Sequence, residues 1–145
     1  MTIGECAEKV SKAVSMESEA VEYVVRDKEF NDGLVKMEQD RLFEGARADG
    51  TVIEPEYTLF TKRVKSANGQ PTDRVTLFDT GSFYNNMFVR KDGDSLIFSS
   101  SDSKTEELVE KYGEAIFGLT DYDKEEAKKD SAVLILRWLK EVTGL

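Results

Sequence analysis

The sequence predicts a single α+β domain over residues 1–145, with a helical region at 1–44 followed by an α+β core at 45–145. Three observations predict it: apolar residues at helical spacing in the first third, a β-hairpin pattern in the middle, and two capped helical segments at the end. With 39% hydrophobic and 34% charged residues among 145, the chain can bury one modest core.

The N-terminal region is predicted to be helical because its apolar residues recur every three to four positions. This stripe consists of Ile3, Cys6, Ala7, Val10, Ala13, Val14, Ala20, Val21, Val24, Phe30, Leu34 and Met37, and Arg41 continues its spacing. Asp27 or Asn31 can cap a second helix and Gly33 weakens helical continuity, so one long kinked helix and two helices both fit. Such a polar extension packs either on its own domain or on a neighbouring subunit, and the pattern favours neither.

Residues 45–76 are predicted to form a long, ordered interaction loop. Both prolines of the chain, Pro55 and Pro71, fall within it. A connection of about thirty residues is usually either functional or disordered. Tyr57, Leu59 and Phe60 are expected to anchor the loop to the core, and this favours an ordered loop.

The triplet Asp79-Thr80-Gly81 is predicted to be a structural corner. Asp and Thr side chains can hydrogen-bond the nearby backbone, and Gly admits a positive φ, so we expect Gly81 in that conformation. The same triplet occurs in aspartic proteases, whose chemistry needs two aspartates sharing a proton. The sequence contains the triplet once, so we interpret it as the turn that orients the hairpin after it.

A β-hairpin, or small antiparallel sheet, is predicted over residues 83–99. Residues 83–90 and 95–99 are rich in aromatic and β-branched side chains. Asp92-Gly93 between them is expected to occupy the two positive-φ positions of a type I′ turn. The hairpin, with Phe88 and Ile97 on its strands, and the 45–76 loop are expected to contact another chain, because an unpaired edge strand is a template for association.

Two helices are predicted to close the chain. In the first, Ser103 and Glu106 have the spacing of a capping box, Tyr112 faces inward with Leu108, and Gly113 ends the helix.

The second begins at a cap on Thr120 or Asp121 and ends at Gly144. Its apolar residues include Ala127, Leu134, Leu136, Trp138, Leu139 and Val142. Its acidic residues alternate with lysines, which is typical of a solvated helix face.

The composition excludes several classes of function. The chain has no histidine, which removes Ser-His-Asp and Cys-His catalysis, and its lone Cys6 cannot build a Cys-rich zinc site or a disulfide framework. We therefore expect no enzymatic activity, no cofactor and no metal, and an origin in a reducing compartment. Residues 121–125 match a calcium loop too poorly to hold the ion. The N-terminus lacks the pattern of a signal peptide, and no apolar run is long enough for a membrane span.

The charge distribution argues against direct DNA binding. The formal net charge is −9, and only the middle third, residues 46–91, is basic, with seven Lys and Arg against five Asp and Glu. Four basic residues (Lys62, Arg63, Lys65 and Arg74) could neutralise only a few phosphates of a nucleic acid.

The order of several short motifs is more informative than any one of them. They are MEQDRLFEG at 37–45, GQPTDRVTL at 69–77, DTGSFY at 79–84 and KYGEAIFGL at 111–119. In this order they resemble the virion-morphogenesis (tail-completion or head–tail connector) proteins of tailed bacteriophages. The resemblance covers roughly residues 37–119 and is nearest to the branch carried by phages and prophages of Bacteroidetes.

The resemblance implies a structural virion protein that forms a ring at the head–tail connector or in the tail, as a completion or terminator protein. Its partners would be copies of itself and other neck or tail proteins, and DNA could pass through the assembly. The protein would be made in the host cytoplasm and end in the virion. The alternative is a small regulatory module that binds protein or nucleic acid.

Overall fold

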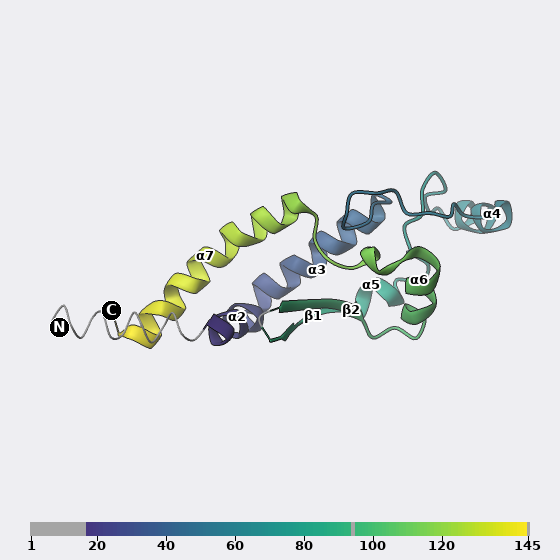
Figure 1. Ribbon diagram of the computed structural model, residues 1–145. Helices are drawn as coiled ribbons and strands as arrows, with labels where there is room; N and C mark the ends of the chain where they lie inside the picture. The colour runs from purple at the N-terminus through teal and green to yellow at the C-terminus, as the bar shows by residue number, and fades with distance from the viewer. Residues whose placement is uncertain (1–16, 94, 145) are drawn as a thin grey trace.

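The computed structural model describes residues 17–93 and 95–144, and it confirms the predicted α+β fold (Figure 1). The predicted apolar stripe at residues 3–14 lies outside the described residues. The elements in chain order are α2 (Glu17–Arg26), α3 (Lys28–Phe43), α4 (Leu59–Ala67), α5 (Ser82–Asn85), β1 (Met87–Asp92), β2 (Ser95–Ser100), α6 (Thr105–Tyr112), the 3₁₀ turn η1 (Glu114–Ile116) and α7 (Asp121–Thr143). None of these helices is long and apolar enough to cross a membrane.

The described part of the N-terminal region forms two helices, which decides between the two arrangements that the sequence left open. Asp27 has an extended backbone (φ −65°, ψ 117°) and its Oδ1 accepts a hydrogen bond from the Phe30 N–H at 2.9 Å. It therefore acts as the N-cap of α3. Asn31, the other candidate cap, instead donates from Nδ2 to the carbonyls of Val25 and Val89.

Two adjoining groups of buried side chains form the core. The larger group joins the end of α3, the segments around residues 53 and 75–77, α5, β1 and α6 with η1. It consists of Leu42, Ile53, Val75, Leu77, Phe83, Tyr84, Met87, Tyr112 and Ile116. The smaller group, Leu34, Val89, Leu119 and Ala127, connects α3, β1 and the start of α7. α3 contributes to both groups and is the central element of the fold.

The hairpin is shorter than the sequence predicted, and its turn is shifted by one residue. Residues 83–85 belong to α5, which begins after Gly81 at φ +91°. β1 and β2 are antiparallel with Asp92 opposite Ser95, so the two-residue connection starts at Gly93 rather than at Asp92. Gly93 has a positive φ of +61°, whereas Asp92 is the last residue of its strand.

The segment 45–76 is not a loop throughout, because α4 lies within it. The Thr58 Oγ1 caps this helix by accepting the Thr61 N–H at 3.2 Å. Tyr57 is an anchor, as predicted: its hydroxyl oxygen accepts the N–H groups of Thr76 and Leu77, both at 3.1 Å. Leu59 and Phe60 were also predicted to anchor the segment, and this prediction was wrong because both are exposed on α4.

The two C-terminal helices are present, with one different cap. α6 buries Tyr112 and ends at Gly113, whose φ is +94°. Its N-terminus is fixed by Asp102, whose Oδ2 accepts the Lys104 N–H at 3.1 Å, so the predicted cap on Ser103 was wrong. α7 begins after the cap residue Thr120, one of the two predicted candidates.

Candidate assembly surface

Helix α4 presents an apolar face to solvent. Leu59, Phe60 and Val64 are 65%, 76% and 44% exposed, and with Arg63 they share one side of the helix. Figure 1 shows α4 at one end of the molecule, beyond α6, with the C-terminal part of α7 at the other end. Sequence reasoning expected Phe60 to anchor this segment, but the structure turns Phe60 outward.

A lysine holds α4 to the rest of the chain. Lys65 is buried and its Nζ donates to the Phe78 carbonyl at 2.5 Å and to Gln70 Oε1 at 3.2 Å. The same ammonium lies 4.7 Å from the centroid of the Tyr57 ring, a cation–π distance. Because a charged side chain makes the inward contact, the apolar side of α4 is left to solvent.

The corner at residues 79–81 is bound by polar contacts on both sides. Asp79 Oδ2 lies 3.3 Å from Lys104 Nζ, and the Asp79 carbonyl accepts Gln70 Nε2–H at 2.9 Å. Thr80 Oγ1 accepts the Ser82 N–H at 3.3 Å. Gly81 has a φ of +91°, which confirms the predicted positive φ. Through Gln70 and Lys104 the corner contacts both the segment that follows α4 and the start of α6.

Several of the predicted site residues gather around one cavity. A cavity of about 520 Å³ between α4, the corner and α6 is lined by Tyr57, Phe60, Asp79, Thr80 and Tyr112, among others. In the described part of the chain, no group of three or more acidic, cysteine or histidine side chains is arranged to hold a metal ion.

The remaining predicted site residues lie apart from this cavity. Phe88 and Ile97 share the outer face of the hairpin and are half-buried, whereas Val89 and Phe98 face the core. Gly113 is exposed at the end of α6, and Asp92 and Gly93 are exposed at the hairpin tip. In the described residues β2 pairs with β1 alone, so its outer edge is unpaired.

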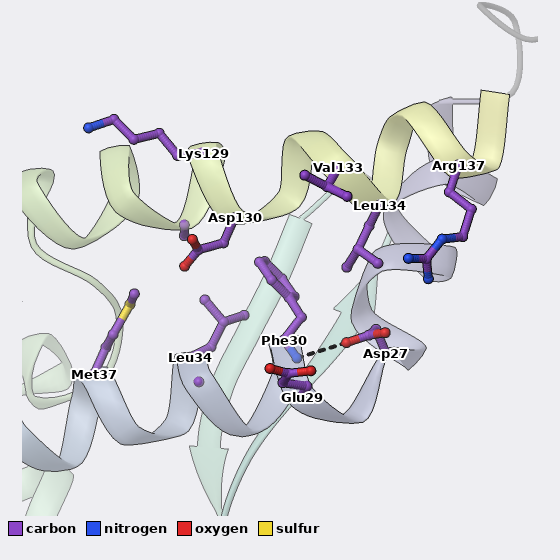
Figure 2. A pocket seen from close by; sticks show the side chains of 12 residues that line it. Asp27, Glu29, Phe30, Leu34, Met37, Lys129, Asp130, Val133, Leu134 and Arg137 are labelled. Atoms are coloured by element: carbon purple, nitrogen blue, oxygen red, sulfur yellow. Dashed lines mark hydrogen bonds between the residues drawn. The ribbon is translucent and has the colours of Figure 1, made fainter. Parts of the chain in front are cut away.

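Sequence reasoning missed a groove between α3 and α7. Figure 2 shows this space, which measures about 650 Å³. Its walls include the apolar side chains of Phe30, Leu34, Met37 and Leu134. Gly33 also lines it, and a Cβ at this position would have no heavy atom within 4 Å. The groove depends on how two helices about ninety residues apart are placed, so no local pattern could reveal it.

A buried acid and a buried base fix the connection that leads into α7. Glu38 is fully buried, and its Oε1 accepts the Gly118 N–H at 2.9 Å, while its Oε2 has no partner among the described residues. Arg41 donates to the carbonyls of Ile116 and Gly118, and to that of Ala46 at 3.1 Å. These bonds hold residues 116–118 against α3 and so set where α7 starts.

Burial determines the electrostatics of this pair. It raises the pKa of Glu38 to about 7, although the Gly118 N–H and the charge of Arg41 both act in the opposite direction. Burial also lowers the pKa of Arg41. On α3 Glu38 and Arg41 lie four and seven residues after Leu34, on the face that Leu34 and Leu42 bury. This spacing was the one signal in the sequence that the two charged side chains would be buried.

Comparison with protein-family models, curated proteins and solved structures gave no match. A functional assignment therefore depends on the geometry described above and on the resemblance carried by residues 37–119.

Proposed function

We propose that this chain is a structural virion protein of a tailed phage that assembles with copies of itself into a ring at the head–tail connector or in the tail. One observation carries the proposal: α4 lies at one end of the molecule with Leu59, Phe60 and Val64 exposed. A cluster of exposed large apolar side chains marks an interaction site. The motif order at residues 37–119 supplies the class of assembly.

The positions of the basic residues favour this function over nucleic-acid binding. Lys65 is buried, and Lys62 pairs with Glu56 at 3.7 Å. Arg74 Nη1 pairs with Asp73 at 2.8 Å, and its Nε donates to the Phe43 carbonyl at 2.6 Å. These three basic side chains are therefore buried or paired within the chain, whereas nucleic-acid binding needs several basic side chains that neutralise phosphates on one surface.

Light scattering after size-exclusion chromatography, together with negative-stain electron microscopy, tests the proposal. We expect the purified chain to form a discrete closed oligomer, or to be monomeric alone and present in purified phage particles by mass spectrometry. A chain that is monomeric at all concentrations and absent from such particles would contradict it.

A further inference from the structure

We propose that α4 of one copy docks in the α3–α7 groove of the next copy. This inference rests on the proposed function, because it requires a chain that assembles with itself. It adds the partner surface: the apolar side of α4 would cover the groove floor around Leu34 and Leu134 of a neighbour. Each copy would use one end as the donor and the groove as the acceptor.

The groove has the properties of an acceptor for a helix. Its floor is apolar, and Figure 2 shows Phe30, Leu34 and Met37 of α3 pointing toward α7, and Leu134 of α7 pointing back. The packing of the described residues does not require a glycine at position 33 of α3. A glycine in a helix interior destabilises that helix relative to alanine, and here no heavy atom of the described residues lies within 4 Å of where its Cβ would be. A missing Cβ permits close approach of another backbone.

α4 has the properties of the occupant. It is a helix of nine residues whose exposed apolar positions 59, 60 and 64 lie on one side, the pattern of helices that bind in apolar grooves. In the described structure the opposite side is held by the buried Lys65, so binding would not require α4 to detach.

The charges on the two surfaces are complementary. The charged side chains that line the groove are Asp27, Glu29, Lys129, Asp130 and Arg137. Figure 2 shows Asp130 pointing from α7 toward α3, and Lys129 pointing away, while Arg137 lies at the far end. Glu29 and Asp130 make no ion pair with a described residue, and α4 carries the exposed Arg63, which is likewise unpaired. Arg63 of a docked α4 would pair with Glu29 or Asp130.

The placement of the two surfaces requires a second copy. Figure 1 shows α4 at one end of the molecule, whereas the groove lies between α7 and the N-terminal half of α3, toward the other end. A contact between two different surfaces of identical chains is heterologous, and its repetition gives a closed ring or an open filament. Where the rotation between neighbouring copies closes, the same contact gives the ring that the proposed function needs.

Cysteine cross-linking of the full chain tests the contact. In a Cys6→Ser background, we would mix Val64→Cys with Val133→Cys, because Val133 lines the groove and is 62% exposed. The matched control is Val64→Cys mixed with Tyr122→Cys, which is 74% exposed on α7 but outside the groove. We expect a disulfide-linked dimer of the first pair at about tenfold the yield of the control, because docking raises the effective concentration of the two thiols at the contact. Equal yields, no dimer, or a Val64→Cys homodimer in its place would overturn the proposal.

A second variant separates this inference from the proposed function. Gly33→Leu places a side chain in the groove from a position where an added Cβ meets no described atom within 4 Å. The variant should therefore fold and melt at or above the temperature of the parent. We expect its self-association constant to fall by about tenfold or more, since a blocked pocket removes an anchor residue. If Gly33→Leu still forms the parent oligomer, the groove contact is wrong and the ring proposal stands. If the parent chain never associates and never enters particles, both are wrong.

Discussion

At the scale of single residues, Glu38 links the protein's stability to pH. Its pKa is raised from 4.5 to about 7 in the folded chain by burial. The folded state therefore binds a proton more tightly than the unfolded state. The contribution of this proton binding to the free energy of unfolding is complete below about pH 4.5 and is lost as the pH rises toward 7. A shift of this size corresponds to roughly 3 kcal/mol.

The test is Glu38→Gln, which mimics the neutral acid. We expect the parent to lose up to roughly 3 kcal/mol of unfolding free energy relative to the variant between pH 4.5 and 7. Urea unfolding of both proteins across this range measures the difference. An identical pH dependence for parent and variant would show that Glu38 titrates normally.

The same change, Gly→Ala, should have opposite effects at two glycines. Gly81 has a φ of +91°, and an added Cβ there meets atoms only at the ordinary distance of 3.5 Å, so the cost comes from the backbone conformation. We expect Gly81→Ala to lower the unfolding free energy by about 1 kcal/mol or more. Gly33 is helical and open, so Gly33→Ala should raise it by up to about 1 kcal/mol. Thermal melts of the two variants compare the signs directly, and two equal shifts would refute the argument.

Asp79 is expected to be structural and not catalytic. Its carboxylate is exposed and its partner is Lys104 at 3.3 Å, an ion pair of the kind that contributes little in water. Asp79→Asn should leave the melting temperature nearly unchanged and should abolish no enzymatic turnover. A hydrolase activity in the parent that disappears in this variant would contradict the proposal that this chain is a structural virion protein.

At the scale of elements, Lys65 determines whether α4 keeps its place. Its ammonium makes two hydrogen bonds and a cation–π contact. A hydrogen bond to a charged group contributes about 1.5–3 kcal/mol. Lys65→Met should therefore increase amide hydrogen exchange in residues 59–67 by about tenfold or more, while exchange in α3 is unchanged. Lys62→Met, whose ammonium is paired at the surface, is the matched control and should have little effect. Slow exchange retained in Lys65→Met would place the anchor elsewhere.

The elements that sequence reasoning found are those that bury apolar residues at helical spacing, although Val133, Ile135 and Leu136 of α7 are exposed. α2, α3, α6 and α7 follow the helical period, and both the cap on Asp27 and the stop at Gly113 could be predicted from local chemistry. α4 was missed because its apolar side chains are exposed while the charged Lys65 is buried. Sequence reasoning assumes the opposite arrangement, with apolar residues inside and charged residues outside. The cap at Thr58 was the one local signal that could have found it.

Tertiary placement accounts for what the sequence could not show of the candidate site. The groove and the bonds of Arg41 to Ile116 and Gly118 join segments more than seventy residues apart. The turn at Gly93 was displaced by a single position, because the strand register depends on packing as well as on the turn residues. The predicted positive φ of Gly81 was confirmed, since a local turn motif determines it.

At the scale of the whole molecule, a head-to-tail contact makes a prediction that a symmetric contact does not. Phe60→Glu would disrupt the apolar side of α4, the donor, and Gly33→Leu would block the acceptor groove. Each variant alone should therefore be monomeric. In a mixture, the intact α4 of the Gly33→Leu chain can still bind the intact groove of the Phe60→Glu chain. Light scattering of the mixture should therefore show a dimer and nothing larger, whereas the parent forms the complete oligomer. The control is Val52→Glu, exposed to 65% away from α4 and the groove, which should assemble like the parent. A mixture that stays monomeric, or single variants that form dimers, would exclude head-to-tail assembly through these two surfaces.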